Sequence, residues 1–379
     1  MAMGGNAVAK KRKKNKPVLQ QMAALFTGLF LLATMYAGVA FAEWHTYAVD
    51  EVPGDEGYLV SEFTGTVTVT FLGDCTLGGE ASYRNNAQGF VHTIARNGTA
   101  YPFRNLKKLT ENDDITVANL EGVLTDRKLP AMEKVFTFSG PTAYTGILKE
   151  GSVECVTLAN NHSGDYGRPG TGDTEKALDQ AGIAWFGTEH VAICEIHGIR
   201  IGFAGISITL NGNAGKRYRE QMEALKNAGC EVVITVMHAG TEYDLTPNVY
   251  QKRMAKKAIA YGADLVIGHH PHVVQGYETV DGIPVVYSLG NCVFGGNMHP
   301  DDYRAAVVQA DLVFDESELT EITLRFVPIL ISGRTDFNDY SPVLPDREIN
   351  EQILSMMEKS TGFPIERENG EATVRFDMR

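Results

Sequence analysis

Imidazole and carboxamide side chains gather in two segments that each follow an apolar run of strand length. Gly268-His269-His270-Pro271-His272 follows 263–267, and Asn160-Asn161-His162 follows 154–159. Both segments lie where a parallel strand passes into a loop, and ligands bind at this edge of open α/β sheets. Because these side chains are donors that a two-metal hydrolase uses, they indicate a metal-dependent phosphoesterase-type site.

Three other predicted strands end in residues that could bind metal or transfer protons. These ends are Gly73-Asp74-Cys75-Thr76, Asn119-Leu120-Glu121-Gly122 and the segment 238–242, which contains His238 and Glu242. Each has an ordinary explanation on its own, such as an Asx-turn at Asp74 or a hydrogen-bonded core histidine at position 238. However, four of the ten histidines fall at predicted strand ends: His162, His238, His270 and His272. We interpret this convergence as one shared site.

The residue types in this set favour two borderline divalent cations. A bridging carboxylate at Glu121, with Asp74, Asn161 and three histidines around it, suits Mn²⁺, Zn²⁺ or Fe²⁺ better than Mg²⁺ or Ca²⁺, which prefer all-oxygen sites. Two such ions roughly 3.5 to 4 Å apart can hold a phosphoryl group and lower the pKa of a water molecule. His270 and His272 would project to one side of an extended chain, and His269 to the other.

One further residue is a candidate general acid, and two others are candidates for orienting an imidazole ring. His162 directly follows the proposed ligand Asn161, so it could reach the leaving-group oxygen as a general acid. Asp165 or Glu242 would orient an imidazole through a hydrogen bond.

Strands alternate with helices along most of the chain. β-Branched and apolar runs predict strands at 66–72, 115–118, 153–159, 199–206, 232–237, 265–267 and 285–289. Helices are predicted at 141–150, 174–181, 218–228 and 246–261, and several end at glycine. This order predicts an α/β fold with a largely parallel sheet in a domain spanning 64–335. Residues 336–379, with a helix at 348–359 and a strand at 372–376, are expected to cap the domain.

The N-terminal region predicts a membrane anchor. Residues 1–17 form a basic tail, and residues 18–42 carry no charge and are long enough to span a bilayer. Because basic residues stay in the cytoplasm, we expect a single-pass protein in contact with membrane lipid and an extracellular C-terminal domain. Ala40-Phe41-Ala42 also has the small-x-small form of a signal-peptidase site, which would make the domain secreted. Residues 43–63 are polar and are predicted to form a stalk.

The region beyond the apolar segment is acidic. Its 28 basic and 47 acidic residues give a formal charge of −19. Such a surface repels polyanions, so nucleic acid is not expected as a partner. Binding of an anionic substrate would need metal ions or basic side chains such as Lys216, Arg217 and Arg219.

The ordered motifs resemble those of the CapA family of poly-γ-glutamate capsule synthesis proteins. The similarity runs from about residue 66 to 332 and covers Gly73-Asp74 and the segments 119–122, 159–167, 238–242, 268–275 and 287–291. The resemblance implies a calcineurin-like metallophosphoesterase fold, which is a sandwich of two β-sheets flanked by helices with metal ions at the sheet edge. It also agrees with an N-terminal transmembrane helix and an exported domain.

The resemblance also implies a role for each ligand. Asp74 and His272 would hold one cation, Asn161, His238 and His270 would hold the other, Glu121 would bridge them, and His162 would be the acid. Two positions depart from the wider superfamily. Thr76 stands where a histidine is usual, and Glu121 stands where the bridging residue is usually aspartate. The Asp74 cation is therefore expected to have one ligand fewer.

We expect from the resemblance a membrane-anchored protein that supports synthesis or export of poly-γ-glutamate or a related capsule polymer, with a two-metal phosphoester hydrolase site. Its partners would be the polymer or a phosphoester substrate, and membrane proteins of capsule synthesis. Two alternatives stay open. The missing ligand at position 76 favours a non-catalytic, polymer-binding assembly subunit, and the same cations could serve an amidase that cleaves the glutamyl polymer.

Overall fold

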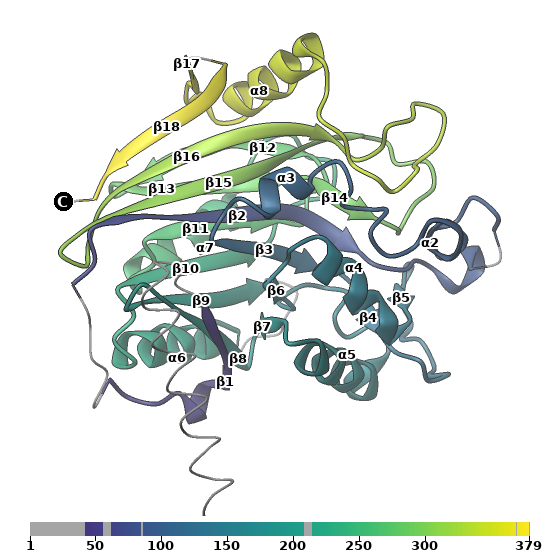
Figure 1. The fold of residues 1–379 in the computed structure, drawn as a ribbon, viewed down its shortest axis with the longest axis horizontal. Coiled ribbons are helices and arrows are strands. Elements are labelled where there is room, and N and C mark those ends of the chain that lie inside the picture. Colours follow the sequence, from purple (N-terminus) through teal and green to yellow (C-terminus); the bar gives the residue numbers. More distant parts are fainter. Residues whose placement is uncertain (1–41, 56–61, 85, 208–213, 369, 379) are drawn as a thin grey trace, which may run out of the picture. The chain divides into compact units, whose positions relative to one another are not determined.

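Two β-sheets face each other, and the main hydrophobic core lies between them (Figure 1). The computed structural model describes residues 42–55, 62–84, 86–207, 214–368 and 370–378. Residues 42–379 form one compact unit. Val69 and Phe71 of one sheet share the core with Ile234 and Ile267 of the other. The fold is therefore mixed α/β and is organised around a sandwich of two sheets.

The seven-stranded sheet brings two of the predicted ligand segments together. Its order is β1 (Glu43–Ala48), β8 (His190–Ile196), β9 (Ile199–Ser207), β10 (Val232–His238), β11 (Leu265–His269), β13 (Ile283–Leu289) and β12 (Val274–Val280). The four strands β9, β10, β11 and β13 are parallel, so their carboxyl ends meet at one edge. His238 and His269 are register partners at the ends of β10 and β11. The loops that follow these strands therefore start side by side.

The nine-stranded sheet has a parallel half and an antiparallel half. Its order is β17 (Glu366–Glu368), β18 (Glu371–Asp377), β16 (Glu318–Leu330), β15 (Arg304–Asp315), β2 (Gly65–Thr76), β3 (Ile115–Leu120), β6 (Cys155–Thr157) and β7 (Ala184–Phe186), with β14 (Asn291–Phe294) paired to β2. The strands from β2 to β7 in this order are parallel. The expectation of a largely parallel sheet misses the long antiparallel hairpin of β15 and β16, which alternates buried and half-buried residues along much of its length.

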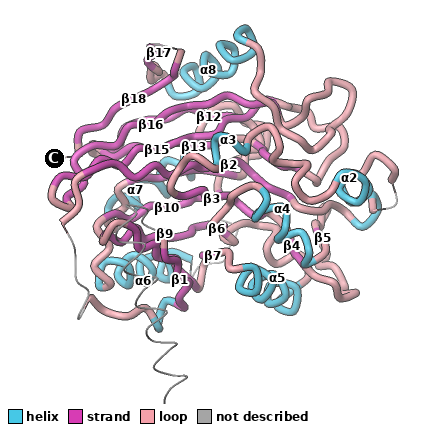
Figure 2. The backbone as a smooth tube through the Cα atoms, in the orientation of Figure 1, coloured by secondary structure: helices cyan, strands magenta, loops and turns pink. Residues whose placement is uncertain are grey.

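Helices cover the outer faces of both sheets (Figure 2). On the seven-stranded sheet lie α6 (Ala214–Asn227) and α7 (Val249–Ala260), which bury Tyr218 and Ala255 against it. On the nine-stranded sheet lie α2 (Phe90–Asn97), α4 (Thr145–Glu150) and α5 (Gly167–Ala181), which bury Phe90 and Leu178. The shorter elements are α3 (Lys107–Thr110), β4 (Val123–Leu124), β5 (Ser139–Gly140) and the 3₁₀ turns at Val49–Glu51, Ala81–Tyr83 and Thr142–Tyr144. Coverage of both faces explains why the central strands are continuously apolar.

Several predicted elements are present with shifted ends. The helix predicted from 246 begins at Val249, because the Asn248 side chain caps it by accepting hydrogen bonds from the N–H groups of Tyr250 and Gln251. The helix predicted from 174 begins at Gly167, and Pro169 is tolerated in its first turn because no intrahelical N–H bond is needed there. The strand predicted at 153–159 is limited to Cys155–Thr157.

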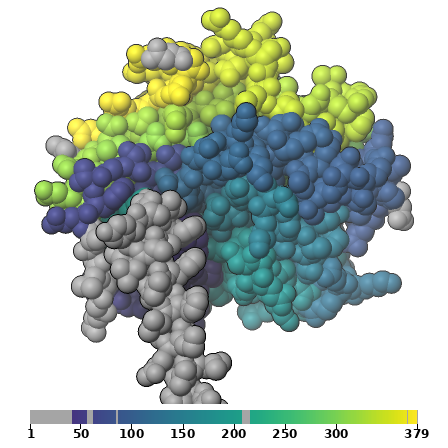
Figure 3. Space-filling model, in the orientation of Figure 1, coloured from purple at the N-terminus to yellow at the C-terminus, as the bar shows by residue number. Residues whose placement is uncertain are grey.

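The segment 336–379 extends the nine-stranded sheet. Strand β18 pairs with β16, and β17 pairs with β18. The helix α8 (Arg347–Thr361) adds Ile353, Leu354 and Met357 to the core between the sheets. In the space-filling view these C-terminal elements form the upper surface of the domain (Figure 3). The expected cap is therefore continuous with the core.

The start of the domain differs from the expected boundary. Part of the stalk predicted at 43–63 is a strand, since β1 pairs with β8 through six residue pairs and Trp44 packs against Phe203 with ring centroids 5.5 Å apart. The predicted basic tail at 1–17 and the apolar segment at 18–42, apart from Ala42, lie outside the described residues. Within the described part of the chain, no helix combines the length and apolar character needed to cross a bilayer.

Candidate metal centre

Asp74 lies at the carboxyl end of β2 and is fully buried. Its Oδ1 atom accepts a hydrogen bond from Asn119 Nδ2 (2.7 Å) and lies 3.1 Å from His269 Nδ1. Its Oδ2 atom lies 3.3 Å from His272 Nδ1. Burial acts to raise the pKa of Asp74, but the hydrogen bonds and charges of His269 and His272 hold this pKa well below its usual value. The carboxylate is therefore ionised and negative.

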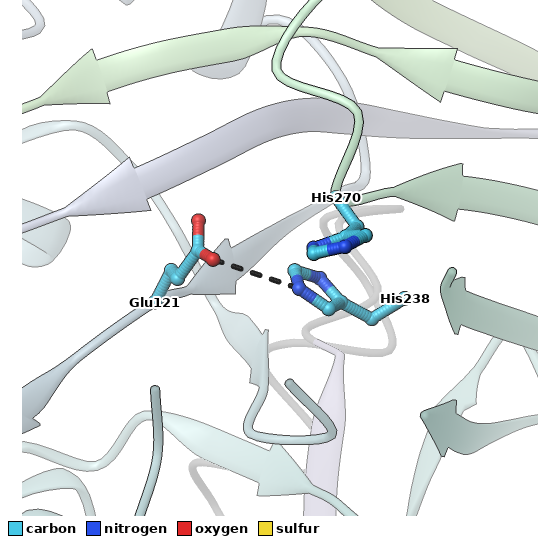
Figure 4. Close-up of side chains that lie close together, drawn as sticks. All are labelled: Glu121, His238 and His270. Carbon is cyan, nitrogen blue, oxygen red and sulfur yellow. Dashed lines mark ion pairs between the residues drawn. The ribbon is translucent and has the colours of Figure 1, made fainter. Parts of the chain in front are cut away.

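Glu121 directly follows β3 and has a buried carboxylate that lacks hydrogen bonds. Among the described residues, neither carboxylate oxygen of Glu121 has a hydrogen-bond partner. The nearest ion-pair contact is His238 Nε2, 3.5 Å from Oε1, and His270 lies next to it (Figure 4). Burial and the charge of Asp74 raise the pKa of Glu121 to about 8. A polar group buried in this way is costly unless a ligand such as a cation satisfies it.

Asn161 and His238 bring donor atoms from the two sheets into contact. His238 Nε2 lies 2.7 Å from Asn161 Oδ1, and His238 Nδ1 lies 3.3 Å from Asn119 Nδ2. His238 is the last residue of β10, whereas Asn161 follows β6. Burial lowers the pKa of His238 well below its usual value, so the ring is neutral and can act as a metal ligand.

His270 and His272 adopt a backbone conformation that is uncommon outside glycine. Their φ angles are 100° and 58°, so the loop is not the extended chain expected for a His-x-His pair. Such conformations persist where the surrounding structure imposes them, often at functional sites. His269 also differs from the expectation that it points away, because its Nδ1 atom contacts Asp74. The loop thus directs three successive imidazoles, with Pro271 between two of them, around the cluster.

The two imidazoles of this loop have different charge states. Burial, and then the charge of His272, lowers the pKa of His270. Burial also acts to lower the pKa of His272, but Glu121 and Asp74 outweigh it and raise this pKa to about 10. His272 Nδ1 also lies 2.9 Å from Asn291 Oδ1. His270 is therefore neutral, whereas His272 is positively charged and offsets the negative charge of Asp74.

The buried ligand atoms form two groups that share Glu121. The first contains Glu121, His238 and His270, and the second contains Asp74, Glu121 and His272. Within each group the donor atoms lie within 4.8 Å of one another. All six residues predicted as ligands therefore gather at one place, with Asn161 joined to His238. A further group contains Glu242, which is exposed, with His270 and His272.

His162 is held beside this cluster by Asp165. His162 Nδ1 lies 2.7 Å from Asp165 Oδ2, and the ring packs against Phe138 with centroids 4.4 Å apart. Asp165 is fully buried and also accepts hydrogen bonds from Phe138 N (2.7 Å) and Lys134 Nζ (2.5 Å). Asp165 therefore has the position expected of an orienting residue, and the predicted alternative, Glu242, has no hydrogen bond to His162 among the bonds described.

Supporting residues that were not predicted as ligands surround the predicted ligands. Asn160 Nδ2 donates to Asn119 Oδ1 (3.0 Å), and Asn160 Oδ1 accepts from the N–H of His162 (3.0 Å). Asn119 and Asn160 lie inside recognised motifs, so their position was a usable signal. Lys134 lies 27 residues before Asn161 in a loop without a regular pattern, and no sequence signal marked it.

Thr76 and the basic residues at 216–219 do not take part in the metal-ligand cluster. Thr76 has a buried hydroxyl without a hydrogen-bond partner among the described residues, and it belongs to neither buried ligand group. The expected basic patch at 216–219 lies on α6, where Lys216 and Arg217 pair with Glu220 and Arg219 bonds Tyr261. These charges are therefore balanced by neighbours, which does not favour this patch as an anion-binding site.

Known proteins resemble this chain over most of its length. Residues 68–296 match the profile of a family described as "Bacterial capsule synthesis protein PGA_cap". The chain is 28% identical over 254 residues to "Capsule biosynthesis protein CapA" of Bacillus anthracis, a match that covers 60% of this chain and 60% of that protein. It is 26% identical over 392 aligned residues to "PGA biosynthesis protein CapA" of Bacillus subtilis (strain 168), a match that covers 97% of this chain and 93% of that protein.

A third relative comes from another bacterial group. The chain is 25% identical over 300 residues to a "Probable polyglutamine synthesis accessory protein" of Mycobacterium tuberculosis, a match that covers 66% of this chain and 77% of that protein. The chain thus spans about three fifths of the Bacillus anthracis relative and nearly the whole of the Bacillus subtilis relative.

Proposed function

The chain belongs to the bacterial capsule synthesis protein family PGA_cap, and we propose that it is a membrane-anchored accessory protein in the synthesis or export of poly-γ-glutamate or a related capsule polymer. Relatives named for capsule, PGA and polyglutamine synthesis support this proposal. The uncharged segment at 18–42 supports the anchor. We assign to the domain a two-metal phosphoester hydrolase site of the calcineurin-like type.

The observation that carries the hydrolase proposal is the buried carboxylate of Glu121. Neither of its oxygens has a hydrogen-bond partner among the described residues, yet it lies between two groups of donor atoms. Such a carboxylate fits a bridge between two cations, because both oxygens would then be satisfied. A purely structural role would leave it buried and unpaired at a cost.

The donor set fits borderline divalent cations such as Mn²⁺, Zn²⁺ or Fe²⁺. Asp74 and His272 would hold one ion, and Asn161, His238 and His270 would hold the other, with Glu121 shared. When bound, the two ions supply positive charge that polarises a phosphoryl oxygen and stabilises the transition state. The neutral rings of His238 and His270 are already in the protonation state that ligation requires.

His162 is the residue that would deliver a proton. Its Nδ1 atom is bound to Asp165, so Nε2 is the atom that remains to donate a proton to the leaving-group oxygen. The buried carboxylate of Asp165 fixes the orientation of the ring through this contact. Lys134 and the N–H of Phe138 hold Asp165 from the other side.

A non-catalytic assembly subunit is the second candidate, and Thr76 favours it. The residue lies at the end of β2, but its hydroxyl belongs to neither group of donors. The Asp74 group therefore has three protein ligands, and a weakly held cation there would leave a binding protein with one metal ion.

The test is metal content and hydrolysis, measured on the full chain in detergent. We expect close to two Mn²⁺ per chain and Mn²⁺-dependent turnover of a generic phosphomonoester or phosphodiester. His162→Ala should keep the metal and lose turnover, and His270→Ala should lose both. His92→Ala, an exposed histidine on α2, is the matched control and should change neither. One ion or none, without turnover, would favour the assembly subunit.

A further inference from the structure

Exposed apolar side chains gather in two segments beside the metal-ligand cluster. Among the described residues, nine large hydrophobic side chains are exposed, and seven of them lie in 132–136 and 243–250. These seven form what we call the apolar rim: Met132, Val135, Phe136, Tyr243, Leu245, Val249 and Tyr250. Single exposed apolar residues are ordinary, but seven in two short segments that each adjoin the ligand loops favour an interaction site there.

The first segment of the rim is bonded to the loop that carries the proposed acid. The N–H of Met132 donates to the carbonyl of Asp165 (2.8 Å), and Lys134 Nζ donates to the carbonyl of Asn161 (2.6 Å). The backbone bond of Met132 and the side-chain bond of Lys134 hold the segment next to the ligand loop, while Val135 is 86% exposed. The apolar side chains of 132–136 are therefore exposed on a loop that is held in place next to the metal-ligand cluster.

The second segment is bonded to the loop that carries the histidine ligands. The N–H of Tyr243 donates to the carbonyl of Pro271 (2.8 Å), and the Tyr243 ring centroid is 6.3 Å from that of His272. Val249 and Tyr250 begin α7 and are exposed on its first turn. Both segments thus adjoin ligand loops, so a molecule that covers the rim also reaches the cluster.

The charge of the rim argues against a polyanion as its occupant. The segments 132–136 and 243–250 carry only Glu133, Lys134 and Asp244 as charged residues. Lys134 is already paired with the buried carboxylate of Asp165. A glutamyl polymer would find little attraction there, and a folded protein seated on the rim would cover the ligand cluster and shut out substrate.

We propose that the substrate of this site is a lipid-borne phosphoester, whose phosphate lies on the cation ligands and whose hydrocarbon chains lie on the apolar rim. The inference rests on the proposed hydrolase function and adds the substrate class. Hydrolysis adds water across the ester bond: the water oxygen bonds to phosphorus, the phosphorus–oxygen ester bond breaks, and the lipid alcohol leaves with a proton from His162. The proton that the attacking water releases passes through solvent and replaces the one that His162 gave. Burial of the chains on the rim supplies binding that a water-soluble phosphoester lacks.

The experiment compares two substrates with the same headgroup, using the full chain in phosphatidylcholine nanodiscs. Phosphatidic acid carries the phosphate on a lipid, and glycerol phosphate carries it on a soluble alcohol. We expect kcat/KM to be at least about tenfold higher for the lipid. The variants Val135→Ser/Phe136→Ser and Val249→Ser/Tyr250→Ser should lower the lipid value at least about fivefold and leave the soluble value within about twofold. Leu344→Ser, exposed outside the rim, is the control.

A second readout does not depend on turnover. A photoreactive phosphatidic acid should label the rim segments in the His162→Ala variant, as located by mass spectrometry. If the rim segments are labelled but the parent chain hydrolyses neither substrate, the result would support lipid binding at the rim and contradict the proposed hydrolase activity. Turnover of glycerol phosphate without rim labelling, and with no effect of the rim variants on the lipid, would overturn the inference and leave the hydrolase standing.

Discussion

Asn161 Oδ1 and His238 Nε2 lie 2.7 Å apart, and this contact joins the ends of strands from different sheets. Asn161 follows β6 of the nine-stranded sheet, and His238 ends β10 of the seven-stranded sheet. The donor atoms meet only when the two sheets pack together correctly. Cation affinity should therefore depend on packing between the sheets as well as on the ligands themselves.

Replacing His238 should weaken cation binding. His238→Ala removes a proposed ligand and the contacts to Asn161 and Asn119. We expect the Mn²⁺ affinity of that site to fall at least about tenfold, since even the loss of a residue behind a ligand has an effect of this size. Equilibrium dialysis followed by elemental analysis measures it. Equal affinity in His238→Ala and in the exposed-surface control His92→Ala would remove His238 from the ligand set.

Glu121→Gln should have opposite effects on the metal-free and metal-bound protein. Without metal, burial and the charge of Asp74 raise the pKa of Glu121 to about 8, so at pH 9 its carboxylate is a buried charge without a hydrogen-bond partner among the described residues. The amide removes this charge, so the melting temperature of the metal-free protein at pH 9 should rise by several degrees. The same change removes the bridge, so Mn²⁺ should no longer stabilise the protein. Scanning calorimetry with and without Mn²⁺ separates the two effects. A variant that melts lower without metal yet still gains stability from it would argue for a structural carboxylate.

Lys134 should position His162 through Asp165. Lys134→Met leaves the buried Asp165 carboxylate without its cation, and we expect about 1–3 kcal/mol of lost unfolding free energy, because the Lys134 side chain is one third exposed. In the proposed hydrolase, kcat should fall about 10- to 100-fold while KM stays similar. Lys134→Arg keeps the charge and should restore most of both. Urea unfolding and steady-state kinetics give the two quantities, and full activity in Lys134→Met would contradict this role.

Glu154 should make stability depend on pH far from the metal centre. Burial raises its pKa from 4.5 to about 7, and its Oε2 accepts a hydrogen bond from the N–H of Thr116 (2.8 Å). The folded state therefore holds a proton that the unfolded state releases above about pH 4.5. The contribution of Glu154 to the unfolding free energy of the protein therefore falls by about 1–3 kcal/mol as the pH rises from about 4.5 to 7, and it is constant above that pH.

Glu154→Gln tests this sign, because the amide can still accept the bond from Thr116 but cannot ionise. Its unfolding free energy, measured in urea at several pH values, should decline by about 1–3 kcal/mol less than that of the parent chain between pH 4.5 and 7. A smaller decline remains, because burial also raises the pKa values of Asp113 and Asp264 to about 6. Glu150→Gln, an exposed neighbour, should keep the decline. Parallel curves for the parent chain and Glu154→Gln would show that the group does not titrate in this window.

The residues predicted as metal ligands lie close together in the structure, and most of them could be found from the sequence because they stand at strand ends. Asp74, Glu121 and His238 each stand at or next to the last residue of an apolar run, so the edge of the sheet was readable without the structure. The rest depends on contacts between distant segments. Lys134 reaches Asp165 from a loop without periodicity, and the left-handed backbone of His270 is imposed by its surroundings and not by its residue type.

The buried parallel strands of the fold were easier to predict from the sequence than the strands that are half-buried. The parallel strands β3, β6 and β7 are fully buried, and β2 is buried over its last eight residues, so these strands are apolar runs. The hairpin of β15 and β16 was missed, although its twelve and thirteen residues pair along almost their whole length. Strand β1 was also missed, because Glu43–Ala48 is half-buried at a sheet edge and carries no clear alternation.

The position of β1 has a mechanical consequence. Chain that enters the domain at Ala42 passes directly into a strand held by six residue pairs to β8, with no slack in between. A tether at this point would transmit tension straight into the seven-stranded sheet that carries His238 and His270. Tension applied there would load the hydrogen-bond ladder between β1 and β8 first, and β8 and β9 lie between that ladder and β10, which ends at His238.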